Sequence, residues 1–114
     1  MSPITTHILD ISQGAPASGV PVLLEFLEFE QKWDVIGEGV TDSDGRSRDL
    51  LPDGFPLKKG VYRLTFKTEE YFNTIQVKGF YPVVQVIFEI RDQTSHYHVP
   101  LLLSPYGYST YRGS

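Results

Sequence analysis

Cysteine is absent from the 114-residue sequence, and so is any long apolar run. Without cysteine the chain has neither disulfide bridges nor a thiol nucleophile, a composition typical of a reducing compartment. A membrane-spanning helix needs roughly 20 apolar residues, and no apolar run approaches that length. Residues 1–4 lack the basic and apolar regions of a secretory signal, and the C-terminus is not a Ser-Lys-Leu peroxisomal address. We expect no membrane association and a cytoplasmic location, or a peroxisomal one if a targeting segment precedes this sequence.

Positive charge is also scarce. Lysine and arginine number 10 against 14 aspartates and glutamates, which gives a net charge of -4 and a pI near 5.2. The charges are scattered, whereas a nucleic-acid surface needs clustered lysine and arginine. We therefore expect no nucleic-acid partner. A chain of this length fits a single domain, residues 1–114, that is small enough for self-association to add stability.

Short segments of alternating polarity fill most of the sequence. In a strand, alternate side chains share a face, so a core face is predicted for Tyr97, Val99, Leu101 and Leu103. The same period predicts strands at residues 4–11, 20–30, 33–41, 46–51, 60–67, 83–90, 97–103 and 108–114. A single short helix is expected at 68–76, with Thr68 as its N-cap. The order predicts an all-β fold, an antiparallel β-sandwich of about eight strands with one short helix.

Two turns are predicted from residue chemistry. In Asp42-Ser43-Asp44-Gly45 an aspartate can cap the backbone and the glycine accepts a positive φ, so this turn would deliver Arg46 to the next segment. A calcium loop is rejected there, because the glycine comes too early and no glutamate follows at the required distance. Ser104-Pro105-Tyr106-Gly107 would join the last two strands as a hairpin.

Residue spacing offers two generic kinds of site, a zinc site and a serine nucleophile. His96 and His98 share one strand face and could bind zinc together with His7. A surface or interface histidine pair is favoured over zinc, since the chain lacks cysteine and no carboxylate is tied to the pair by spacing. A serine nucleophile is rejected because residues 107–111 do not match Gly-x-Ser-x-Gly.

Three motifs carry a family resemblance. The segment Leu102-Leu103-Ser104-Pro105-Tyr106-Gly107-Tyr108-Ser109-Thr110 resembles the signature of the transthyretin family. Residues 6–17, beginning Thr6-His7-Ile8-Leu9-Asp10, resemble its N-terminal motif, so the likeness spans nearly the whole chain. The ending Tyr111-Arg112-Gly113-Ser114 is similar to that of the family's enzymatic branch, the 5-hydroxyisourate hydrolases, and is absent from its hormone-carrier branch. The resemblance implies one transthyretin-like domain.

The same resemblance implies a site. Taken alone, each candidate has an ordinary explanation as a solvated residue. The positions matching the hydrolases' catalytic residues are His7, Arg46, His98 and Ser114, and those matching the substrate-binding set add Tyr111, Arg112 and Gly113. The hormone carrier has Lys, Glu and Thr at the positions of His7, Arg46 and His98. Arg48 is the only competitor for the role of Arg46. The resemblance further implies a homotetramer, a dimer of dimers with the sites in a central channel, and neither a metal nor an organic cofactor.

The implied reaction is hydrolysis of 5-hydroxyisourate to 2-oxo-4-hydroxy-4-carboxy-5-ureidoimidazoline in urate degradation. Opening a ring amide needs a base for water, a proton donor for the leaving nitrogen and positive charge beside the oxyanion. Histidine suits the first two roles and arginine the third. Strand alternation places Tyr111 and Ser114 on opposite faces unless Gly113 bends the chain. A ligand carrier of the transthyretin type and a purely structural β-sandwich are the alternatives.

Overall fold

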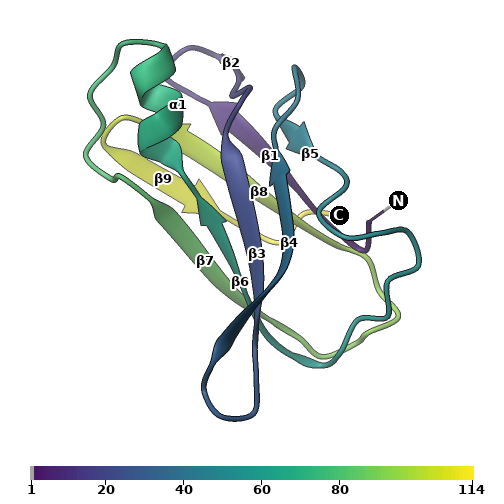
Figure 1. The fold of residues 1–114 in the computed structure, drawn as a ribbon. Coiled ribbons are helices and arrows are strands. Elements are labelled where there is room, and N and C mark those ends of the chain that lie inside the picture. Colours follow the sequence, from purple (N-terminus) through teal and green to yellow (C-terminus); the bar gives the residue numbers. More distant parts are fainter. Residues whose placement is uncertain (1) are drawn as a thin grey trace.

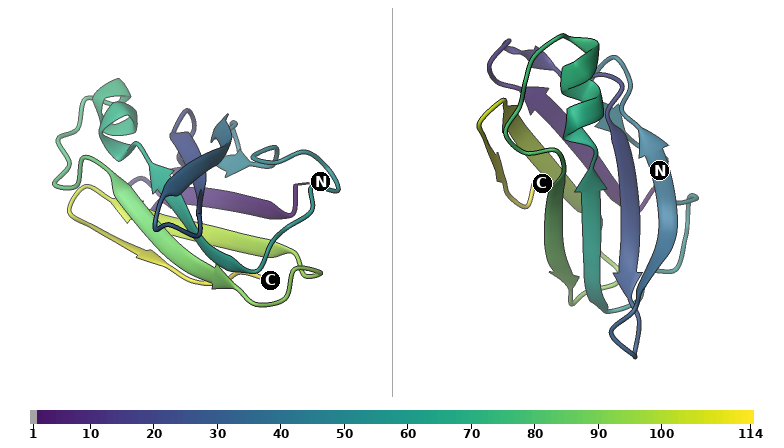
Figure 2. Two further views of the ribbon diagram at one scale, coloured as in Figure 1. Left: turned by 60° about the horizontal axis from the view of Figure 1, so that its bottom comes forward. Right: turned by 60° about the vertical axis from the view of Figure 1, so that its left-hand side comes forward.

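The computed structural model describes residues 2–114 as two β-sheets packed face to face, with one short helix at one end (Figure 1). The elements follow the order β1 (Ile4–Asp10), β2 (Ala15–Pro16), β3 (Pro21–Leu27), β4 (Trp33–Val40), β5 (Arg46–Ser47), β6 (Gly60–Phe66), α1 (Thr68–Thr74), β7 (Val84–Ile90), β8 (Tyr97–Ser104) and β9 (Gly107–Thr110). The predicted all-β sandwich with one short helix is confirmed, and Figure 2 shows the two layers from the side.

The two sheets differ in strand direction. One sheet has the order β4-β3-β6-β7 and is antiparallel throughout. The other has the order β2-β1-β8-β9, with β5 also paired to β1. Within it β1 and β8 run parallel, from Ile4 opposite Tyr97 to Asp10 opposite Leu103. The expectation of a wholly antiparallel sandwich is therefore wrong for this pair. Parallel neighbours need a long crossover, and here the entire other sheet lies between the two strands in the chain.

The core lies between the inner faces of the sheets. The predicted face of β8 is confirmed, because Tyr97, Val99, Leu101 and Leu103 are at most 6% exposed. Strands β3 and β6 contribute the next layer, with Leu24, Leu64 and Phe66 fully buried. Each such aliphatic or aromatic side chain stabilises the fold by about 1.5–3 kcal/mol relative to exposure. The buried faces therefore determine which side of each strand points outward.

Several predicted elements are shorter in the structure, among them the strand expected at 46–51 and the helix expected at 68–76. Strand β5 comprises only Arg46–Ser47, and the helix ends at Thr74. The helix N-cap is Lys67, not Thr68, whose hydroxyl instead donates to the Tyr81 carbonyl at 2.8 Å and ties the helix to the loop before β7. The left-handed φ of 58° at Gln76 stops the helix from continuing. Within residues 2–114, no helix has the length and hydropathy needed to cross a bilayer.

A buried carboxylate joins β1 to the helix. Asp10, the last residue of β1, is 0% exposed. Its Oδ1 accepts hydrogen bonds from the backbone N–H (3.1 Å) and hydroxyl (2.6 Å) of Ser12, and its Oδ2 accepts one from the Tyr71 hydroxyl at 2.7 Å. Burial, followed by the bond to Asp10, raises the pKa of Tyr71 far above its ordinary value. Tyr71 therefore remains a donor to this carboxylate at any physiological pH.

The C-terminal hairpin has the predicted turn, with Pro105 and Tyr106 linking β8 to β9. The backbone groups of successive β8 residues form hydrogen bonds with the segments on either side of the strand. The Tyr97 N–H donates to the Pro3 carbonyl on the N-terminal side, and the His98 carbonyl accepts from the Gly113 N–H at 2.8 Å on the C-terminal side. Pro100, two residues after His98, faces the same neighbouring segment, but proline has no backbone N–H to donate to that C-terminal segment. Strand β9 accordingly ends at Thr110, and pairing returns only at the bridge between His98 and Gly113. The last residues are thereby held beside His98.

Candidate active site

A polar cleft of about 310 Å³ lies on the five-stranded sheet. Its walls come from β1, β5 with the segment after it, β8 and the C-terminus. The lining residues are Thr5, Thr6, Arg46, Arg48, His96, His98 and Ser114. Three of the four predicted catalytic residues, Arg46, His98 and Ser114, thus share one cleft.

The turn before β5 positions Arg46. The Asp42 carboxylate accepts hydrogen bonds from the backbone N–H groups of Asp44 (2.9 Å) and Arg46 (3.0 Å), and the bond from Arg46 is the main cause that lowers the pKa of Asp42. Gly45 has a φ of 77°, and a Cβ there would collide with the Ile8 carbonyl, so glycine is required. The predicted turn is confirmed. It sets Arg46 directly opposite His7 in the pairing of β5 with β1.

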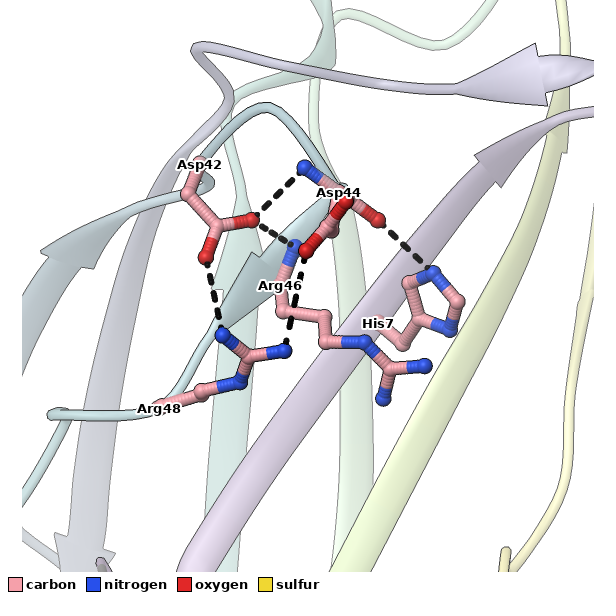
Figure 3. Close-up of polar contacts among 5 residues, drawn as sticks. All are labelled: His7, Asp42, Asp44, Arg46 and Arg48. Carbon is pink, nitrogen blue, oxygen red and sulfur yellow. Dashed lines mark hydrogen bonds and ion pairs between the residues drawn. The ribbon is translucent and has the colours of Figure 1, made fainter.

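The side chains of the two arginines of this segment point in different directions (Figure 3). Arg48 forms exposed ion pairs with Asp42 at 3.6 Å and Asp44 at 3.8 Å. The Arg46 guanidinium has neither an ion pair nor a hydrogen bond with any residue of 2–114, and it extends toward His7. Arg46 is therefore the arginine available to an anionic ligand.

His98 is the half-buried imidazole of the cleft. Its Nδ1 lies 2.8 Å from the Thr5 hydroxyl oxygen. Burial lowers the pKa of His98, and the nearby charges of Arg46, His7 and His96 lower it further. The ring is therefore neutral at neutral pH and able to accept a proton.

His7 lies on β1, two residues after Thr5, and is half-buried. Its Nε2 is 2.9 Å from the Asp44 carbonyl oxygen (Figure 3). Because a carbonyl only accepts, Nε2 carries the proton, and Nδ1 of the neutral ring is left as an acceptor. His7 is not part of the cleft wall, but it is close enough for its charge to lower the pKa of His98.

Gly113 allows the C-terminus to approach His98 closely. A Cβ on Gly113 would lie 2.7 Å from Cδ2 of His98 and 3.2 Å from Cγ of Pro100. Its φ is not in the left-handed region, so the glycine serves close contact and not the backbone bend expected from sequence. Ser114 follows it into the cleft.

Tyr111 and Arg112 line a different cavity. This second space, of about 300 Å³, opens between β7 and the C-terminal hairpin. The Arg112 guanidinium lies 4.4 Å above the centre of the Tyr97 ring, within cation–π distance. The single chain therefore brings Arg46, His98, Gly113 and Ser114 together, with His7 beside them, and leaves Tyr111 and Arg112 apart.

Thr5 was not among the sequence candidates, and His96 was expected to be solvated. His96 is exposed, yet both residues line the cleft, and the Thr5 hydroxyl lies between the imidazoles of His96 and His98. Strand alternation does place Thr5 on the face of His7. Its contact with His98 depends on the parallel pairing of β1 with β8, which no local pattern reveals. Within residues 2–114, no group of three or more acidic or histidine side chains could hold a metal ion.

The fold and the cleft define a class of protein. Residues 4–113 match the family model described as the HIUase/Transthyretin family, and the chain belongs to this family. The predicted family resemblance is confirmed.

Individual relatives include both 5-hydroxyisourate hydrolases and transthyretins. The 5-hydroxyisourate hydrolase of mouse is 46% identical over 114 residues, which cover 99% of this chain and 96% of the mouse protein. The solved structure of Klebsiella pneumoniae 5-hydroxyisourate hydrolase superposes with a TM-score of 0.84 at 38% identity, over 97% of this chain and 98% of that one. Sea bream transthyretin in complex with thyroxine superposes with a TM-score of 0.91 at 32% identity, over 98% and 95% of the chains. Shape alone therefore does not separate the two activities.

Proposed function

We propose that this protein hydrolyses 5-hydroxyisourate in urate degradation. The hydrolase relatives from mouse and Klebsiella pneumoniae support this substrate. The observation that carries the proposal is the Arg46 guanidinium, which has no partner among residues 2–114, in the same cleft as the neutral imidazole of His98. An anionic, urate-like ring needs a cation to bind it, and its hydrolysis needs a base that is unprotonated at neutral pH.

The reaction uses the two histidines for proton transfer. His98 and His7 hold the attacking water, and one of them takes its proton as the oxygen adds to the ring carbonyl carbon. Arg46 stabilises the negative charge that develops on the carbonyl oxygen, a role worth several kcal/mol in a preorganised site. The C–N bond then breaks, and the imidazolium returns the proton to the leaving nitrogen, which leaves the opened ureido product. Ser114 anchors the substrate through its hydroxyl or its carboxylate.

The runner-up function is that of a small-ligand carrier, as in the sea bream complex with thyroxine. Carriers of apolar aromatic ligands need mostly apolar walls with a few polar groups. The cleft instead presents two arginines and two histidines. This lining favours a polar, anionic ligand and therefore the enzyme.

We also propose that the active form is a homotetramer, arranged as a dimer of dimers with the clefts facing a central channel. Strands β7 and β9 are the unpaired edges at one side of the two sheets, and such edges pair readily with another chain. Large apolar or aromatic side chains are exposed on both, with Ile87 60% and Tyr108 42% accessible. Pairing of these edges would cover surface that a single chain leaves in water.

The decisive experiment generates 5-hydroxyisourate in situ from urate and uricase and follows its ultraviolet absorbance. The wild-type protein is expected to accelerate the decay. Arg46→Gln is expected to lower kcat/KM by about 10²–10³-fold, the usual cost of losing one group that stabilises an oxyanion. Arg48→Gln is the matched control, since it removes the same charge two residues away and is expected to cost far less. Decay at the spontaneous rate with folded wild-type protein would refute the enzyme and favour a carrier.

A further inference from the structure

The hydroxyl group of Thr5 bridges two imidazoles. Its oxygen lies 2.8 Å from Nδ1 of His98 and 3.3 Å from Nε2 of His96. Thr5 is only 6% exposed and is directly opposite His98 in the parallel pairing of β1 with β8. The two histidines flank Tyr97, the first residue of β8: His98 lies within the strand and His96 immediately precedes it. The hydroxyl is therefore held between them by the sheet.

The number of protons restricts this bridge. A threonine hydroxyl has one proton to donate and two lone pairs that accept. When His96 is protonated, its Nε2 is a donor, so the Thr5 oxygen must accept from it. If the oxygen also accepted from Nδ1–H of His98, the hydroxyl proton would have no acceptor between the two rings. Donation of that proton to Nδ1 of a neutral His98, which then carries its own proton on Nε2, satisfies all three groups. Thr5 can donate to Nε2 of His96 only when that nitrogen carries no proton. The Thr5 oxygen can then accept from Nδ1–H of His98.

We propose that Thr5 is a positioning residue whose single hydroxyl proton couples the tautomer of His98 to the protonation state of His96. With His96 neutral, the bridge permits the tautomer of His98 whose Nε2 is free to accept a proton from water. With His96 protonated, the bridge selects the tautomer whose Nε2 is a donor. The link to catalysis rests on the hydrolase function proposed above.

The surroundings of His98 allow such coupling. Burial and neighbouring positive charge lower the pKa of His98, so its ring stays neutral at neutral pH. The other charged or titratable groups that face His98 are His7 on β1 and Arg46 on β5, with Arg48 and Ser114 in the same cleft wall. Neither arginine changes its charge near neutrality. The imidazole of His7 bonds to the Asp44 carbonyl, away from Thr5.

The direct test measures the tautomers by NMR of the protein labelled with ¹⁵N in its imidazoles. The chain has only three histidines, so single substitutions assign every signal. In wild type, the nitrogen signals of His98 are expected to change from the Nδ1–H toward the Nε2–H pattern as His96 takes up its proton. Thr5→Val should abolish this change and Thr5→Ser should restore it. Thr65→Val, which removes a similarly buried hydroxyl from the other sheet, should leave it intact. The proposal would be overturned if the tautomer of His98 did not change with the protonation state of His96, or if it changed equally in Thr5→Val.

Kinetics test the consequence separately. Thr5→Val is expected to lower kcat by about 10-fold, less than the roughly 10²–10⁴-fold that a proton-transferring group itself contributes, and to change the acid side of the pH profile. Thr5→Ser should recover both. A Thr5→Val enzyme with the wild-type pH profile would refute the coupling during turnover. A wild-type protein without hydrolase activity would refute the proposed function and leave the NMR result to decide the coupling alone.

Discussion

Gly113→Ala is a sensitive test of the closeness between the C-terminus and His98. The added Cβ would lie 2.7 Å from Cδ2 of His98, about 0.8 Å nearer than the roughly 3.5 Å at which two carbons attract each other. The buried Pro100 ring, 3.2 Å away, blocks movement in its direction. Either the imidazole turns away from Thr5 or the last residues detach.

Both responses misplace a catalytic group by close to 1 Å. A displacement of that size costs about 100-fold in a well-oriented reaction. Allowing for partial relaxation, we expect kcat/KM for 5-hydroxyisourate to fall by about 50-fold, equivalent to about 2.3 kcal/mol of transition-state stabilisation. The unfolding free energy should change by less than about 1 kcal/mol, because terminal segments contribute little to global stability.

Gly107→Ala provides the control for this experiment. A Cβ at Gly107, six residues earlier in the hairpin, would meet only Oγ of Ser104 at 3.8 Å, an ordinary contact. Steady-state kinetics and chemical denaturation of both variants separate activity from stability. If Gly113→Ala retained kcat/KM within twofold of Gly107→Ala, the close contact with His98 would have no catalytic importance.

Three further predictions concern pH and stability. Because the pKa of His98 is lowered in the folded protein, the unfolded chain binds a proton at this residue at a higher pH than the folded protein does. His98 should therefore destabilise the fold only as the pH drops below about 6.5. When unfolding is measured against pH, the loss of stability at low pH should be smaller in His98→Gln. Tyr71→Phe removes a hydrogen bond to the buried carboxylate of Asp10 and should cost about 1.5–3 kcal/mol in urea denaturation, and an unchanged midpoint would contradict this. Ser47 is 1% exposed, and its hydroxyl has no hydrogen-bond partner in residues 2–114. Ser47→Ala should therefore raise the unfolding free energy by about 1 kcal/mol. A lowered melting temperature of this variant would instead indicate that the hydroxyl forms a stabilising hydrogen bond.

Strand faces could be predicted from sequence because each depends on its own residues. Alternation in β8 gave the core side correctly, and the turn of residues 42–45 followed from aspartate and glycine chemistry. The shortness of β5 could not be predicted, since only two of its residues meet β1. The helix start at Thr68 was predicted correctly, but its N-cap was misassigned, because the Thr68 hydroxyl has a distant acceptor, the Tyr81 carbonyl.

The same distinction applies to the site. Family motifs supplied His7, Arg46, His98 and the C-terminal residues, and the structure brings Arg46, His98 and Ser114 to one cleft. Thr5 was missed because it meets His98 across 93 positions of sequence. The sequence pointed to Gly113 for its backbone freedom. In the structure this glycine matters because a Cβ there would lie too close to His98 on β8. Contacts of this kind depend on strand pairing and not on residue type.

The parallel pairing of β1 with β8 also has a consequence for biosynthesis. The edge of β1 that receives β8 must remain open until residues 97–103 leave the ribosome, which takes about 5–20 s after β1 at usual elongation rates. During that interval an unpaired, largely apolar strand edge is available to other nascent chains. Slow translation of the middle of the message would therefore lower the yield of native protein, and chaperone binding should concentrate on nascent chains that have completed β7 but not β8.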